Sequence, residues 1–199
     1  MRKFELARKV THGVLEEGVL AYPDATIPEY QTKHSAGADF FAAEDIVIPS
    51  VWEEVQKSLH RYEIFSPTIL KPTLVHTGIK ACMEEDEVLY LYNRSSNPGK
   101  LGLILANSVG VVDSDYYNNK DNDGEIMFAF YNIGSEDVTI SAGDRIGQGV
   151  FQKYLKPTVE LKVKQTERIG GLGSTDKPIC ESLSKAFKEA AQNEDPSFF

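Results

Sequence analysis

The chain has 199 residues, 41% of them hydrophobic and 10% aromatic, which suits one folded domain with a hydrophobic core of its own. Its formal net charge of -9 argues against a surface that binds duplex nucleic acid, although an acidic protein can still contain one locally basic pocket. No apolar run approaches the roughly 20 residues of a membrane span, and the N-terminus lacks the apolar core of a secretory signal.

Most of the chain is predicted to form short strands, because β-branched and aromatic residues come in brief runs between turn signals. The predicted strands are 46–48, 73–75, 87–92, 124–131, 137–140 and 150–155. The turn signals fall at 97–99, 118–119, 123–124 and 142–144. Many short strands at close spacing favour a sandwich, barrel or jelly roll over a fold in which strands and helices alternate.

Two segments interrupt this pattern with helical signals. Ser50 and Glu53 match a capping box, and apolar residues then recur at helical spacing as far as Tyr62. Near the C-terminus, Asp176 and Pro178 suit the start of a second helix with one apolar face. We expect both apolar faces to pack against protein rather than against a cofactor.

Cys82 and Cys180 lie far apart and outside any CxxC pattern. Two free thiols are the simplest interpretation, and they favour a reducing, cytoplasmic location.

Arg94, Ser95 and Ser96 follow an apolar strand and precede a Gly/Pro turn. An arginine side chain is a rigid fork of donors that matches a phosphate group, and hydroxyls and loop N–H groups can complete the shell. The triplet is therefore a candidate phosphate-binding segment. The competing interpretation is a surface turn with a solvated arginine.

Asp113 ends an apolar hairpin that begins near Asn107 and bends at Gly110. A carboxylate among apolar neighbours can act as a general base when it faces a water held near an electrophile. It can equally be a turn residue at the end of a strand. Tyr116 follows three residues later, where its ring can lie beside a sugar held by the same hairpin or simply be half-buried.

Residues 168–175 form a glycine-rich run that ends in Ser174 and Thr175. Glycine lets a backbone approach phosphates closely, so the run can fold over a phosphate chain. It lacks the GK[ST] ending of a Walker loop. The competing interpretation is a linker before the last helix.

Together these segments resemble the five motifs of the trimeric deoxyuridine triphosphatases (dUTPases), in the order typical of that family. The matching segments are 36–40, 94–96, 107–116, 143–148 and 168–175. Residues 77–81 are also similar to that family. The resemblance spans about residues 27–176, and five motifs in one order are far more specific than any single glycine-rich loop.

The resemblance implies an all-β, distorted jelly roll that assembles as a homotrimer with active sites shared between subunits. It implies hydrolysis of dUTP to dUMP and pyrophosphate with Mg²⁺, which the triphosphate and waters would hold without a direct protein ligand. A divalent cation would neutralise the charge through which water must approach the α-phosphorus. The expected division is a β domain over 1–176, with a helical insert at 51–67 and a mobile arm at 166–176, followed by an extension over 177–199.

The motif residues take their roles from this resemblance. Asp113 would orient and deprotonate the attacking water, a role that contributes about 10² to 10⁴-fold in rate. Asp39 would support the site by holding metal-bound waters or the closing arm. The substrate-binding residues would be Arg94, Ser95, Ser96 and Gln148 at the phosphates, Asn107, Gly110 and Val111 at the uracil, Tyr116 at the deoxyribose, and Arg168, Leu172, Gly173, Ser174 and Thr175 in the closing arm.

The sequence departs from the family pattern in several places. Leu172 stands where a phenylalanine commonly stacks on the base, and a leucine covers the base without stacking. Asp176 stands where a glycine is frequent, and residues 117–123 lengthen the turn after the hairpin. The insert at 51–67 and the extension at 177–199 are further departures, and either one offers a surface for a protein partner.

Two other functions compete with this interpretation. A dCTP deaminase is similar in fold and in the 94–96 region, but it needs an active-site glutamate to move protons, and residues 113–116 read Asp-Ser-Asp-Tyr. A regulatory binding module could also keep the fold, with the insert and extension as its partner surface. The presence of both Asp113 and Tyr116 favours the phosphohydrolase, for which we expect a nucleotide as the substrate and neither nucleic acid nor a membrane as a partner.

Overall fold

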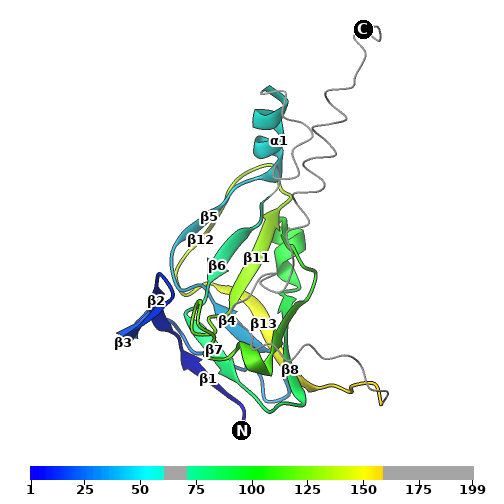
Figure 1. The fold of residues 1–199 in the computed structure, drawn as a ribbon. Helices are drawn as coiled ribbons and strands as arrows, with labels where there is room; N and C mark the ends of the chain where they lie inside the picture. Colours follow the sequence, from blue (N-terminus) through cyan, green and yellow to red (C-terminus); the bar gives the residue numbers. More distant parts are fainter. Residues whose placement is uncertain (61–70, 159–199) are drawn as a thin grey trace, which may run out of the picture.

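The computed structural model describes residues 1–60 and 71–158 (Figure 1). In this part the chain is built mainly from short strands, which confirms the predicted all-β class. The strands are β1 (Lys3–Leu6), β2 (Arg8–Thr11), β3 (Val14–Leu20), β4 (Ala38–Phe41), β5 (Ile46–Ile48), β6 (Thr73–His76), β7 (Ile79–Cys82), β8 (Glu87–Asn93), β9 (Leu103–Leu105), β10 (Gly110–Asp113), β11 (Met127–Asn132), β12 (Val138–Ile140) and β13 (Arg145–Lys153). The helical elements are α1 (Val51–His60) and two short turns, η1 (Asn97–Leu101) and η2 (Ser114–Tyr116).

The strands pair antiparallel in small sheets. The largest described sheet has the order β10-β8-β13-β4, and a second has the order β6-β11-β9. The remaining described pairs are β1-β7, β12-β5 and β2-β3. Strands that are distant in sequence therefore lie side by side in the largest sheet, which brings the segments around 39, 94, 113 and 148 into one layer.

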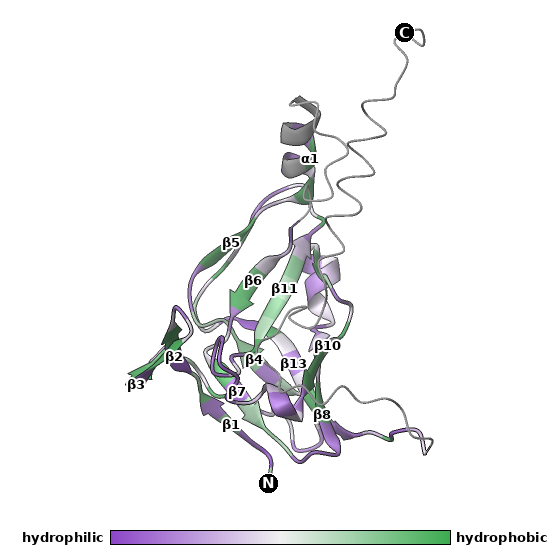
Figure 2. Cartoon of the chain, viewed as in Figure 1, coloured by the Kyte–Doolittle hydropathy of each residue, from purple (hydrophilic) through white to green (hydrophobic). Residues whose placement is uncertain are grey.

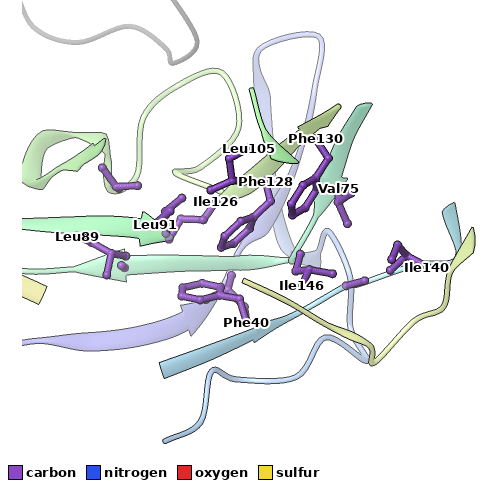
Figure 3. Packing of buried hydrophobic residues seen from close by; sticks show 14 of the residues in the cluster. Phe40, Val75, Leu89, Leu91, Leu105, Ile126, Phe128, Phe130, Ile140 and Ile146 are labelled. Atoms are coloured by element: carbon purple, nitrogen blue, oxygen red, sulfur yellow. The ribbon is translucent and has the colours of Figure 1, made fainter. Parts of the chain in front are cut away.

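The hydrophobic core lies between the two larger sheets. Phe40 of β4 contacts Phe128 of β11 with ring centroids 5.6 Å apart, and Phe128 stacks on Phe130 at 6.2 Å. Figure 3 shows these rings together with aliphatic side chains from both sheets. Figure 2 shows the hydrophobic colour along β6, β10 and β11. Burial of these side chains provides the main favourable term for the fold, at about 25 cal/mol per Å² of apolar surface.

Two glycines in β13 leave room for aromatic rings of the core, one from the facing sheet and one from the neighbouring strand β4. A Cβ at Gly147 would lie 2.0 Å from Cε1 of Phe128, and one at Gly149 would lie 2.5 Å from Cε2 of Phe40. Because side chains alternate along a strand, Gln148 between them faces the opposite side of the sheet. The pattern Gly-Gln-Gly therefore places the core on one face and a polar residue on the other.

The helix α1 begins where the sequence predicts it and projects from the end of the molecule that carries β5 and β12 (Figure 1). The Ser50 hydroxyl oxygen accepts from the Trp52 N–H at 3.3 Å, as a capping residue does. The Ser50 N–H donates to Asp137 Oδ1 at 2.8 Å, so a carboxylate distant in sequence also holds the start of the helix. Within the described residues, no helix is both long enough and apolar enough to cross a membrane.

The hairpin β2-β3 is an element that the sequence did not predict. His12 and Gly13 join its strands with φ values of 52° and 75°, both in the left-handed region that a two-residue hairpin turn requires. The predicted strand at 150–155 is β13, which begins earlier, at Arg145, and ends at Lys153. The first half of β13 was not predicted from the sequence, because it contains glycines and glycine is not typical of a strand interior.

Candidate active site

Asp39 is a buried carboxylate held between two neighbouring strands. It lies in β4 directly opposite Gln148 of β13, and its side chain is only 3% exposed. Gln148 Nε2 donates to Asp39 Oδ1 at 2.8 Å, and Arg145 Nη1 donates to Asp39 Oδ2 at 3.2 Å. A buried carboxylate is costly unless it is paired and hydrogen-bonded. The two donors stabilise the Asp39 charge and fix the orientation of its oxygens.

Arg145 is a site residue that the sequence reasoning did not select. In a regular strand, residues three apart such as Arg145 and Gln148 face opposite sides. The pairing of β13 with β4 shifts register between Arg145 and Gly147, and this irregularity turns both side chains toward Asp39. The only signal in the sequence is the presence of Arg145 inside the 143–148 segment.

Arg94 joins this cluster from the neighbouring strand. It follows the last residue of β8, and its Nη1 donates to the backbone carbonyl of Arg145 at 2.9 Å. Ser95 is exposed and Ser96 is half-buried at the start of the turn that follows. We call Asp39, Arg94, Ser95, Ser96 and Gln148 the Asp39 half of the candidate site.

The turn after Arg94 is anchored to the sheet by Asn97. This residue is 2% exposed, and its Nδ2 donates to Asn93 Oδ1 at 2.8 Å and to the carbonyl oxygen of Ile146 at 2.9 Å. The sequence predicted only a turn here, because the Asn-Pro-Gly pattern does not reveal which strand the asparagine side chain reaches.

The hairpin that carries Asp113 lies at the edge of the same sheet. β10 pairs only with β8 in the described sheet order, so its other edge offers backbone N–H and C=O groups. Val111 is 57% exposed, Asn107 is exposed in the preceding turn, and Asp113 is half-exposed. A Cβ at Gly110 would lie 2.9 Å from Leu91 Cβ, so the hairpin needs a glycine there to lie flat on β8.

Tyr116 is more buried than an ordinary surface tyrosine. It is 8% exposed and belongs to the hydrophobic core, while its hydroxyl donates to the carbonyl oxygen of Glu125 at 3.0 Å. Its predicted contact with a sugar stays a prediction. We call the segment from Asn107 to Asp113, together with Tyr116, the Asp113 half of the candidate site.

The two halves are far apart within one chain. Asp113 lies opposite Val88 of β8, whereas Arg94 comes six residues after Val88, just past the end of that strand. At about 3.3 Å per residue, this separates their backbones by about 20 Å. A general base must lie within hydrogen-bond reach of the proton that it removes, either directly or through one water. The structure therefore brings the Asp39-half residues together and places Asp113 elsewhere.

The described residues contain no group of three or more His, Cys, Asp or Glu side chains arranged to hold a metal ion. Of the predicted site residues, those of the closing arm lie outside the described residues: Arg168, Leu172, Gly173, Ser174 and Thr175. The extension over 177–199 and residues 61–67 of the predicted insert also lie outside them.

A sequence model of the family described as dUTPase matches residues 58–175. The deoxyuridine 5'-triphosphate nucleotidohydrolase of Lactococcus lactis is 44% identical over 161 residues, which cover 80% of this chain and 95% of that protein. The enzyme of the same name from Helicobacter pylori is 34% identical and covers 77% of this chain, with 91% of that protein aligned.

Solved structures that resemble this chain are also dUTPases. The crystal structure of the dUTPase from Streptococcus mutans has a TM-score of 0.58 and 37% identity, covering 78% of this chain and 98% of that one. A mutant dUTPase from phage phi11 of S. aureus, in which coordination of a structural Mg(II) ion is described, has a TM-score of 0.53 and covers 83% of this chain and 97% of that one. At 17% identity, the phage protein shows likeness of fold alone.

Proposed function

We infer that Asp113 is the general base of this enzyme, since the chain belongs to the dUTPase family and is a dUTP diphosphatase. Asp113 takes a proton from a water as the water oxygen attacks the α-phosphorus of dUTP. The bond from the α-phosphorus to the bridging oxygen of the β-phosphate breaks, and pyrophosphate leaves with that oxygen. A positioned base of this kind contributes about 10² to 10⁴-fold in rate.

The Asp39 half supplies the groups that hold the phosphates. Arg94 and the hydroxyls of Ser95 and Ser96 would donate to phosphate oxygens as negative charge develops on the leaving group. Asp39 and Gln148 would keep this side of the site in place, because their hydrogen bond joins β4 to β13. Arg94 also bonds the carbonyl of Arg145, which limits the directions in which its guanidinium can point.

We propose that each active site is shared between copies of this chain in a homotrimer. Support comes from the register of β8, which separates Arg94 from Asp113 by about 20 Å along one protomer. A base and a phosphate-binding arginine at that separation cannot serve the same α-phosphate. The Asp113 half of one subunit would instead meet the Asp39 half of a neighbour.

The outward face of the largest sheet is suited to such an assembly. Val111 lies opposite Tyr90, and Tyr90 lies opposite Val150, so these apolar side chains share one face with Asp113. Val111 is 57% exposed and Tyr92, on the same face, is 37% exposed. When another subunit covers apolar surface of this kind, its removal from water favours the assembly.

The Asp113 half has the features needed to read a nucleoside. The edge of β10 that pairs with no other described strand offers backbone donors and acceptors near Gly110, and the exposed Asn107 lies at the start of the hairpin. A pocket matched to uracil leaves a donor or acceptor unpaired when cytosine enters, which costs binding free energy. Tyr116 would pack against the deoxyribose.

Magnesium would be held by the triphosphate and by waters, with the chain in a supporting role. Mg²⁺ prefers oxygen ligands and usually keeps several waters, so phosphate oxygens and water would make up most of its shell. Asp39 belongs to the same half of the site as the proposed phosphate-binding residues, and its oxygens already accept from Gln148 and Arg145. The ion, when bound, neutralises phosphate charge.

Mixing two inactive variants tests the shared site. Arg94→Ala and Asp113→Asn subunits, denatured together and refolded as mixed oligomers, should regain pyrophosphate release from dUTP. Some interfaces then combine an intact Arg94 from one subunit with an intact Asp113 from another. The matched control mixes Arg94→Ala with Asp39→Asn, which damage the same half, and should regain none. Equal recovery in both mixtures, or recovery in neither, would overturn the sharing.

A substrate panel tests the chemistry. The parent protein should release pyrophosphate from dUTP much faster than from dCTP, dTTP or UTP, and faster with magnesium than with a chelator. Ammonia release from dCTP would instead identify a deaminase. Absence of turnover with every nucleotide would favour a binding module that retains the fold.

A further inference from the structure

The loop of residues 117–124, between η2 and β11, is a closed structure rather than a simple linker. The Asn118 N–H donates to the carbonyl of Asp123 at 3.2 Å, and the Asp123 N–H donates to the carbonyl of Asn119 at 3.0 Å. Asn118, Asp123 and Gly124 have φ values of 58°, 57° and 84°, in the left-handed region that asparagine, aspartate and glycine tolerate best. These bonds hold the two ends of the loop side by side.

On its inner side the loop holds the Tyr116 hydroxyl. Asn122 Nδ2 donates to the Tyr116 hydroxyl oxygen at 2.9 Å, while that hydroxyl donates to the carbonyl oxygen of Glu125 at 3.0 Å. The same Asn122 amide nitrogen lies 3.0 Å from the Glu125 carbonyl oxygen and donates to it as well. The Tyr116 hydroxyl is therefore fixed by one donor and one acceptor.

Asn122 is itself held in one orientation. Its Oδ1 accepts from Asn119 Nδ2 at 2.8 Å and from the Gly124 N–H at 3.2 Å. Asn119 Nδ2 also donates to the backbone carbonyl of Tyr116 at 3.0 Å. The amide of Asn122 thus uses both its oxygen and its nitrogen within this small region, so it cannot rotate without breaking several bonds.

On its outer side the loop is tied to the N-terminal segment and to β7. The Asp123 carboxylate, 2% exposed, accepts from Arg8 Nη2 at 2.6 Å and from Lys80 Nζ at 2.7 Å. Lys80 Nζ also donates to Asn118 Oδ1 at 2.6 Å. Burial raises the pKa of Asp123, but the hydrogen bonds from Arg8 and Lys80 outweigh it and leave the pKa below its ordinary value. The loop is therefore anchored at both sides.

We propose that Asn122 is a positioning residue that sets the Tyr116 ring and, through it, the preference for a deoxyribonucleotide over a ribonucleotide. The inference rests on the proposed function, in which Tyr116 packs against the sugar. Exclusion of a 2′-hydroxyl by shape works only when the ring cannot move away from the added oxygen. The two-sided anchor of the Tyr116 hydroxyl supplies that restriction, and the 117–124 loop supplies the anchor.

The test compares kcat/KM for dUTP and for UTP in the full-length protein and in Asn122→Ala. The variant should narrow the dUTP preference by about 5- to 10-fold, the factor expected for one lost hydrogen bond. The narrowing should come mainly from a lower KM for UTP, because a looser ring admits the 2′-hydroxyl. Lys120→Ala, an exposed position on the same loop, is the matched control and should keep the parent ratio.

A double mutant identifies the route of the effect. Tyr116→Phe removes the hydroxyl while the loop keeps its internal bonds. Like Asn122→Ala, it should lower the preference for dUTP over UTP. When Asn122→Ala is added to Tyr116→Phe, the ratio of kcat/KM for dUTP to kcat/KM for UTP should fall no further. If Asn122→Ala does not fold, Tyr116→Phe alone decides, since an unchanged ratio overturns the inference.

The remaining outcomes separate this inference from the proposed function. A parent protein that does not hydrolyse dUTP contradicts the proposed function itself. A parent that prefers dUTP to UTP, with an Asn122→Ala variant that loses activity equally on both, contradicts only the positioning role. In that case Asn122 would support folding alone.

Discussion

The two halves of the candidate site are built in different ways. In the Asp39 half, side chains from β4 and β13 and the arginine that follows β8 meet across neighbouring strands, directly above the aromatic core. In the Asp113 half, the residues lie on an edge strand and in a turn, and the 117–124 loop fastens them. Changes to the scaffold of the first half should therefore alter the stability of the whole fold, whereas changes to the second should act more locally.

The largest expected effect is loss of catalysis on Asp113→Asn. An amide cannot take the proton from water, so kcat for dUTP should fall by about 10² to 10⁴-fold. The thermal midpoint and the oligomer size should stay close to those of the parent, because Asp113 lies at a half-exposed edge. The measurement is steady-state pyrophosphate release.

Asp115→Asn is the matched control for that change. Asp115 is an exposed carboxylate two residues away in η2, and its replacement should leave kcat within a few-fold of the parent. If Asp115→Asn proves as inactive as Asp113→Asn, the choice of Asp113 as the base is wrong.

The next effect is on stability in the scaffold of the Asp39 half. A Cβ at Gly147 would lie 2.0 Å from Phe128 Cε1, so Gly147→Ala forces the two main sheets apart. We expect the free energy of unfolding to fall by about 3 kcal/mol, the upper part of the range for overpacked cores. Thermal or denaturant unfolding at fixed protein concentration measures this.

Gly99→Ala serves as the control for Gly147→Ala. A Cβ at Gly99 has no atom within 4 Å, and its φ lies outside the left-handed region. Its effect should stay within about 0.5 kcal/mol, as for other surface substitutions. A Gly147→Ala protein as stable as Gly99→Ala would show that the sheets tolerate separation.

The smallest effect is on the pH dependence of stability, and it arises in the 117–124 loop that fastens the Asp113 half. Hydrogen bonds from Arg8 and Lys80 hold the pKa of Asp123 below its ordinary value despite burial. A carboxyl with a lowered folded-state pKa stabilises the protein fully above its unfolded pKa of about 3.9, and this stability is lost as pH falls through the folded pKa. Asp123→Asn should therefore lower the free energy of unfolding by about 1–3 kcal/mol at neutral pH. The free energy of unfolding should also fall less steeply as the pH is lowered.

Asparagine suits this position, since it tolerates the φ of 57° that Asp123 adopts. Asp121→Asn, at an exposed position of the same loop, should leave both the stability and its acid dependence unchanged. Parallel stability curves for the parent and Asp123→Asn between pH 5 and 2 would be inconsistent with a charged, paired Asp123.

Much of the strand content could be predicted from residue patterns. Residues 87–92 and 46–48 are uninterrupted runs of β-forming residues, and they appear as β8 and β5 with little change. The predicted start of β13 lies too far along the chain, because Gly147 and Gly149 are not typical of a strand interior. The aromatic rings that they accommodate explain why glycine is needed there. The predicted strand from 124 begins instead at Met127, because the Glu125 N–H still donates back to the Asn122 carbonyl of the preceding loop.

The sequence predicted only part of the site, because some site residues are defined by partners that are distant in the chain. Asp39, Arg94 and Gln148 come from motifs whose order is readable, and the structure brings them together. Arg145 escaped notice because a register shift turns it toward Asp39, and Asn122 because its role depends on how a loop closes. Register shifts and loop closure depend on partners distant in sequence, which local patterns do not encode.

The sequence alone determined the all-β class, the family and the residue types available for chemistry, because alternation, turn residues and ordered motifs are local properties of the chain. Only the tertiary structure decided which residues meet. Strand pairing put Asp39 against Gln148 while leaving Asp113 about 20 Å from Arg94, and a folded loop placed Asn122 on the Tyr116 hydroxyl. These juxtapositions arise from sheet register and packing, which are set by the whole chain at once.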